Sequence, residues 1–256
     1  MKAATALFLV PAFVISLALF DARAVHAQSS LEVTVVVKPG KNFPKRKVLK
    51  IPANMAAACG KVPGDDWVVD AKTRGVKWVA VFLKPSAKNG KIKVAPKAAA
   101  ADLKKVIIDQ PACRFIPHMT TMTEGAVLVA KNSSTILHNF KYGQPFNPRQ
   151  ISGNVAIVGG LSVNITGAVA DDSLPINIEC NIHPWMRGYL WVLDHPYHAV
   201  TDEKGVVTLK HVPAGRYRVM AYHGATGWVG GEKGAKGYPI TVGATGTTKL
   251  KLEITP

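Results

Sequence analysis

The chain has 256 residues, and 32 lysines and arginines against 16 aspartates and glutamates give it a formal net charge of +16. Its length is enough for one large or two small hydrophobic cores. So basic a surface would attract acidic proteins, anionic lipid or nucleic acid. We expect no nucleic-acid partner, because the sequence has no helix-turn-helix, RNA-binding or zinc-finger signature.

The first 27 residues predict a secretory signal peptide. Lys2 precedes an apolar stretch that runs to Phe20, and Val25-His26-Ala27 forms a small-residue cleavage site before Gln28. No later stretch approaches the length that spans a membrane. We therefore expect an exported protein, periplasmic or secreted, without a transmembrane segment in the mature chain.

Short strands and turn residues then alternate to the end of the chain. The expected strands are 31–37, 46–51, 76–83, 106–109, 126–131, 155–158, 174–180, 188–193, 206–210, 216–222 and 249–254. Glycine, proline, asparagine and aspartate separate them, so the pattern predicts an all-β fold built from β-sandwiches. A segment with seven lysines, 84–105, is expected to be a solvated loop or short helix.

One short segment predicts a metal centre. Cys180, His183 and Met186 follow the spacing C-x2-H-x2-M, and His138 lies upstream. If Cys180 ends one strand and Met186 begins the next, the loop turns all three side chains toward one point, and His138 must come from another strand. Two imidazoles, a thiolate and a weak axial thioether are the ligands of a blue-copper site. The alternative is a buried free cysteine among ordinary loop residues.

Residues from about 111 to 193 resemble a cupredoxin, most closely the amicyanin-like type of the plastocyanin family. That family's loop reads C-x-x-H-P-x-M-R-G, as 180–188 does here, and its F-x-P, glycine and H-N signals match Phe115, Gly125 and His138. The resemblance implies a Greek-key β-sandwich that carries one type 1 copper ion and transfers electrons. The implied ligands are His138, Cys180, His183 and Met186, with Asn139 tying the two ligand loops together.

The cysteine count adds a second expectation. An exported protein with three cysteines has one left over, and a copper-bound Cys180 leaves Cys59 and Cys113 free to form a disulfide. Sequence alone does not fix this pairing, so two isolated buried thiols remain the alternative. His118 lies near the copper segment, but a lone strand histidine is usually structural.

The rest of the chain suggests a second β module. Residues 199–223 resemble the carboxypeptidase regulatory-like, transthyretin-like sandwich. We expect an N-terminal β module with a basic loop at 28–110, a cupredoxin-like domain at 111–194 and the regulatory-like module at 195–256. The alternative is one discontinuous sandwich, made of 28–83 and 195–256, into which the cupredoxin is inserted.

These features together predict an electron-transfer protein and not an enzyme. Glu179 and Asn181 flank Cys180, so no histidine beside the cysteine connects a second copper centre. His183 is expected to reach the surface within an apolar docking rim that includes Phe140, Pro184 and Trp185. The expected partner is a redox protein with an acidic surface, such as a cytochrome or an oxidase. The alternatives are copper storage or delivery and a metal-free adhesive or carbohydrate-binding sandwich.

Overall fold

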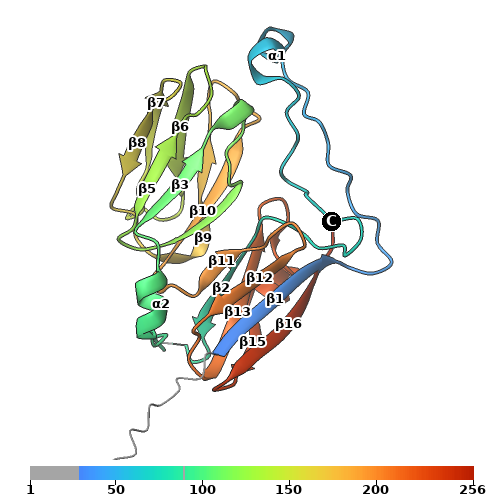
Figure 1. Cartoon of the computed structure of the whole chain (residues 1–256), viewed down its shortest axis with the longest axis vertical. Helices are drawn as coiled ribbons and strands as arrows, with labels where there is room; N and C mark the ends of the chain where they lie inside the picture. Colours follow the sequence, from blue (N-terminus) through green and yellow to red (C-terminus); the bar gives the residue numbers. More distant parts are fainter. Residues whose placement is uncertain (1–28, 89) are drawn as a thin grey trace, which may run out of the picture.

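The computed structural model describes residues 29–88 and 90–256, and the expected signal peptide lies outside these residues. The described chain is mostly β, with its strands in four sheets. Figure 1 shows two groups of strands stacked along the long axis of the molecule. No helix within the described residues is long and apolar enough to cross a membrane.

The first group is a sandwich that we call the inserted sandwich. One sheet has the order β3-β5-β8 and the other β4-β10-β9-β6-β7. Apolar side chains from both sheets, among them Leu128, Ile178 and Leu190, form one buried core. Its strands are β3 (Lys105–Asp109), β4 (Met119–Thr123), β5 (Val127–Lys131), β6 (His138–Gly143), β7 (Gly153–Ile157), β8 (Ser162–Ile165), β9 (Asp171–Glu179) and β10 (Arg187–Leu193), with a short 3-10 turn, η1 (Pro111–Cys113).

The second group, the terminal sandwich, combines strands from both ends of the described chain. One sheet has the order β12-β1-β16; the other has the order β11-β2-β13-β14, with β15 also paired to β13. In Figure 1, blue β1 lies beside red β16. Its elements are β1 (Ser29–Val37), β2 (Val79–Pro85), β11 (His198–Val200), β12 (Val206–Lys210), β13 (Gly215–His223), β14 (Gly227–Trp228), β15 (Tyr238–Val242), β16 (Gly246–Ile254) and the helix α3 (Gly231–Ala235).

This strand pairing makes the terminal sandwich discontinuous, as in the second of the two expected arrangements. The expected boundary at 110 is wrong, however, because β3 pairs in parallel with β5 of the inserted sandwich. Val106 and Ile108 alternate inward along β3 and are buried in the inserted core. The apolar face of β3 is therefore buried in the inserted sandwich and not in the expected N-terminal module. The helix α2 (Pro96–Ala101) precedes this strand.

The expected strand at 46–51 does not form. Only an isolated bridge between Val48 and Pro63 marks this region, and the helix α1 (Ala53–Cys59) follows it. Residues 38–64, which we call the arm, leave β1 and reach the inserted sandwich, with α1 at the top of Figure 1. Five strands were not expected from the sequence: β4, β8, β11, β14 and β15. The strand β6 carries His138, for which a strand was expected without stated bounds.

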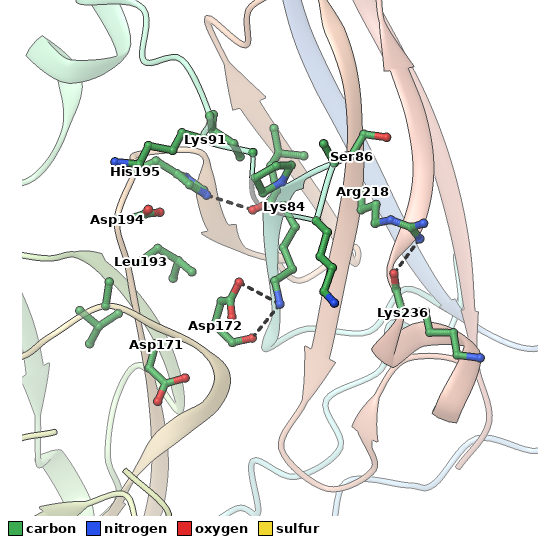
Figure 2. A pocket seen from close by; sticks show the side chains of 18 of the residues that line it. Lys84, Ser86, Lys91, Asp171, Asp172, Leu193, Asp194, His195, Arg218 and Lys236 are labelled. Carbon is green, nitrogen blue, oxygen red and sulfur yellow. Dashed lines mark hydrogen bonds and ion pairs between the residues drawn. The ribbon is translucent and has the colours of Figure 1, made fainter. Parts of the chain in front are cut away.

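A separate apolar cluster joins the two sandwiches. Met119, Trp191 and Leu193 come from the inserted sandwich, whereas Phe82 and Met220 come from the terminal one. The ring centroids of Trp191 and Phe82 are 4.9 Å apart. The rim of this junction carries an ion pair between Lys84 Nζ and Asp172 Oδ2 at 2.8 Å, which Figure 2 shows. The two sandwiches therefore share buried surface.

This junction generates a stability prediction. Trp191 is fully buried, so Trp191→Ala should lower the free energy of unfolding by about 3–5 kcal/mol, as large-to-small changes of buried aromatics do. Phe146→Ala is the matched control, because Phe146 is 80% exposed and little packing is lost. Urea unfolding of both variants measures the difference. Equal stabilities would show that the Trp191 cluster does not hold the sandwiches together.

Candidate metal centre

Two neighbouring strands bring the predicted ligands together where β6 begins and β9 ends. His138 is the first residue of β6, and Cys180 directly follows the last residue of β9. The two strands are antiparallel, with Lys141 opposite Glu179. The beginning of β6 therefore lies beside the end of β9. His183 and Met186 lie on the short loop between β9 and β10.

The structure brings these side chains together in the core. Potential ligand atoms of His138, Cys180 and His183 all lie within 4.8 Å of one another. The two histidine Nδ1 atoms are 2.8 Å apart, and His183 Nδ1 is 3.7 Å from Cys180 Sγ. Met186 packs in the same apolar cluster as Cys180. All four residues are buried, with exposures between 0% and 2%.

Backbone hydrogen bonds hold the ligand loop in a tight turn. The Met186 N–H donates to the His183 carbonyl at 2.9 Å, and the Cys180 N–H donates to the Met186 carbonyl at 3.4 Å. The loop therefore begins and ends at the same place, where β9 passes to β10. This closure orients the three side chains of the C-x2-H-x2-M segment toward one point.

Asn139 connects the two ligand-bearing segments. Its Oδ1 accepts hydrogen bonds from the Asn181 N–H at 2.8 Å, the Ile182 N–H at 3.2 Å and the Cys180 thiol at 3.3 Å. Its Nδ2 donates to Asn154 Oδ1 at 2.7 Å. Asn139 thus fixes the ligand loop to β6, next to His138, as groups around metal ligands commonly do.

The electrostatics of the cluster suit metal binding. Burial, followed by the charge that His183 would carry, lowers the pKa of His138 to about 4. Burial also lowers the pKa of His183. Both imidazoles are therefore neutral at pH 7, the form that binds a metal. A metal bound between the two rings would be held through their Nδ1 atoms, because these are the nitrogens that face each other.

The expectation that His183 reaches the surface is wrong, since it is only 1% exposed. Cys59 and Cys113 form a disulfide, and their sulfurs lie within 4.8 Å of a His183 ring nitrogen. Cys59 ends α1, so the arm and its disulfide cover His183. Sequence reasoning did not identify the arm as part of the site.

The expected docking rim is only partly exposed. Phe140 is fully buried, because it shares an inward face of β6 with His138 and packs against Phe115 at a centroid distance of 5.5 Å. This part of the expectation is wrong. Pro184 is exposed and Trp185 is half-buried. The Trp185 ring lies 5.2 Å from the His183 ring, so it contacts the cluster from the side.

Two other buried histidines are held by structural hydrogen bonds. His118 Nδ1 is 3.0 Å from the Arg187 carbonyl, and His118 belongs to neither candidate ligand group found among the described residues. His195 Nε2 donates to the Leu83 carbonyl at 2.9 Å, as Figure 2 shows, and its Nδ1 accepts from the Tyr197 N–H. Both ring nitrogens of His195 are therefore used, although it lines a cavity of about 750 Å³ between the sandwiches.

No protein-family model matches the chain. No curated protein matches it either. Among solved structures, it is similar to amicyanin from Paracoccus versutus, with 16% identity over 43% of this chain and 97% of that one, at a TM-score of 0.29. A purple cupredoxin from Nitrosopumilus maritimus has 15% identity over 34% of this chain and 98% of that one, at a TM-score of 0.29.

A copper-containing nitrite reductase from Thermus scotoductus is also similar, with 18% identity over 43% of this chain and a TM-score of 0.30. The match spans only 25% of the reductase. Likeness at these values does not establish function.

The contacts of Asn139 predict its contribution to stability. Asn139→Ala removes the acceptor of two loop N–H groups and should lower the free energy of unfolding of the metal-free protein by about 1–3 kcal/mol. Asn154→Ala is the matched control, because it removes one partner of Asn139 and leaves the ligand loop attached. Denaturant titration compares the two. A larger loss for Asn154→Ala would contradict the assigned role of Asn139.

Proposed function

We propose that this chain is an exported, cupredoxin-like type 1 copper protein that transfers electrons between redox partners. The observation that carries the proposal is the convergence of His138, Cys180 and His183 in the core, with Met186 buried beside them. Two imidazoles and a thiolate with a weak thioether are the donor set of such centres. Copper bound there would supply a one-electron couple between Cu(I) and Cu(II).

The surrounding residues suit a centre that changes oxidation state without changing shape. Asn139 and the loop hydrogen bonds hold Cys180 and His183 in place. The disulfide covers His183, and the ligands have almost no exposure, so water is kept from them. A rigid, dry site needs little rearrangement when an electron arrives. Fast outer-sphere transfer follows from that property.

The same features favour a carrier over an enzyme. A catalytic metal centre keeps an open position for substrate, whereas His183 is 1% exposed beneath the arm. The residues beside Cys180 are Glu179 and Asn181, which offer no histidine bridge to a second metal. The disulfide favours an oxidising compartment, in agreement with the expected export signal.

A copper storage or delivery protein would use the same ligands and would differ from an electron carrier only in releasing its metal. The rigid loop and the disulfide-fastened cover favour retention. A metal-free adhesive sandwich would leave the buried imidazole pair and the free thiol of Cys180 without a role. Electron transfer accounts for both features.

A spectroscopic titration tests the proposal. Addition of Cu(II) to the purified protein should produce the strong visible thiolate-to-copper band of a type 1 centre, and Cys180→Ser should abolish it. Met186→Leu should retain the band and raise the reduction potential, because a weak sulfur donor is lost. His118→Gln is the matched histidine control and should retain both the band and the potential.

Three outcomes separate the alternatives. A colourless, weakly bound copper in the unmutated chain would overturn the copper proposal and favour the metal-free adhesive sandwich. A blue protein that gives up its copper rapidly to a chelator would favour delivery. Reversible oxidation and reduction with retained copper is the result expected of an electron carrier.

A further inference from the structure

All charged side chains of the arm are positive. Between residues 38 and 64 there are seven cationic side chains and no acidic one. Arg46 is bound to Asp65 at 2.6 Å. The six lysines are exposed and belong to no ion pair among the described residues; they are Lys38, Lys41, Lys45, Lys47, Lys50 and Lys61.

The arm is fastened over the metal centre. Leu49, Ile51 and Met55 pack against the apolar cluster that contains Cys180 and Met186. Its two halves are joined by hydrogen bonds from the Leu49 N–H to the Val62 carbonyl at 2.8 Å and from the Gly64 N–H to the Lys47 carbonyl at 2.7 Å. Asp65, which Arg46 and Arg114 both contact, anchors its end to the inserted sandwich.

The outermost part of the arm is small and uncharged. The exposed residues of α1 include Ala53, Ala56, Ala57 and Ala58, and Lys50 and Lys61 lie on either side of the helix in sequence. Alanine side chains allow another protein to approach the backbone closely. Cys59 at the end of α1 belongs to the disulfide beside His183. One disulfide therefore separates the helix from the buried ligand.

We propose that the arm is the docking surface for an acidic redox protein and that electrons reach His183 through α1 and the Cys59–Cys113 disulfide. This inference rests on the proposed copper function and names the partner surface that the function requires. One electron leaves the reduced centre of the partner and arrives at Cu(II). The disulfide conducts the electron without being reduced, so no bond forms or breaks.

The charge and shape of the arm select this class of partner. Long-range attraction by the lysines raises the encounter rate with an acidic surface, and the alanine face of α1 provides a neutral point of contact. An anionic membrane is a weaker fit, because the exposed face of α1 has no long apolar side chain to insert.

The test uses the copper-loaded full chain with reduced flavodoxin as an acidic one-electron protein and hexaammineruthenium(II) as a cationic small reductant. Lys47→Glu, Lys50→Glu and Lys61→Glu are combined in an arm variant. Lys210→Glu, Lys233→Glu and Lys251→Glu on the terminal sandwich form the matched control, with the same change in net charge and no ion pair lost among the described residues. A Lys→Gln version of the arm variant makes half the charge change.

Stopped-flow bleaching of the visible band measures each rate. At low salt, the arm variant should react with flavodoxin about tenfold or more slowly, whereas the control should change about twofold to threefold, because steering depends on charge near the contact. The Lys→Gln version should lie between the unmutated protein and the arm variant. With hexaammineruthenium(II), which is cationic, the arm variant should react faster than the unmutated protein. Added salt should remove the rate differences with both reductants.

The possible results separate a failure of the docking surface from a failure of the proposed copper function. A chain that never develops the visible band overturns both proposals. A blue protein whose arm and control variants slow equally overturns the docking surface alone, because net charge then explains the rates. Loss of binding to phosphatidylserine vesicles in the arm variant, with an unchanged flavodoxin rate, would also overturn it and assign the arm to a membrane.

Discussion

The antiparallel pairing of β6 with β9 is the constraint on which the candidate metal centre depends. It places His138 beside the loop that carries Cys180, although the two residues are 42 positions apart in the chain. A slip of one residue would turn His138 and Phe140 to the opposite face of the sheet. Asn139 stabilises the correct register, because its amide binds the backbone of the ligand loop.

The discontinuous terminal sandwich allows the segment between β1 and β2 to cover His183. Because β1 belongs to that sandwich and β2 returns to it, the connection between them is free to reach the inserted sandwich. The disulfide then fastens this connection to η1, beside His183. The buried cluster around Trp191 and Phe82 holds the two sandwiches together while the arm spans them. One chain thus provides both the candidate metal centre and the segment that covers it.

The clustering of His138, Cys180, His183 and Met186 could be predicted from the sequence because three of the four residues lie in one short segment. The C-x2-H-x2-M spacing needs only one short loop, and the odd cysteine count suggested a pairing that the structure contains. The cover over His183 could not be predicted in this way. Residues 46–51 contain the apolar residues Val48, Leu49 and Ile51, which are common in strands, but their partner segment provides only one bridge, so tertiary packing decides their conformation. Phe140 was misplaced although His138 was expected on a strand, because residues two apart in a strand share a face and this alternation was not applied to Phe140.

Under the proposed function, one copper ion is bound by His138, Cys180 and His183. X-ray absorption at the copper edge on the loaded chain identifies the neighbours of the metal without reference to colour or rate. Two imidazole nitrogens and one short sulfur neighbour are expected, with the sulfur lost in Cys180→Ser. A copper surrounded by nitrogen and oxygen alone in the unmutated chain would overturn the assignment of these ligands.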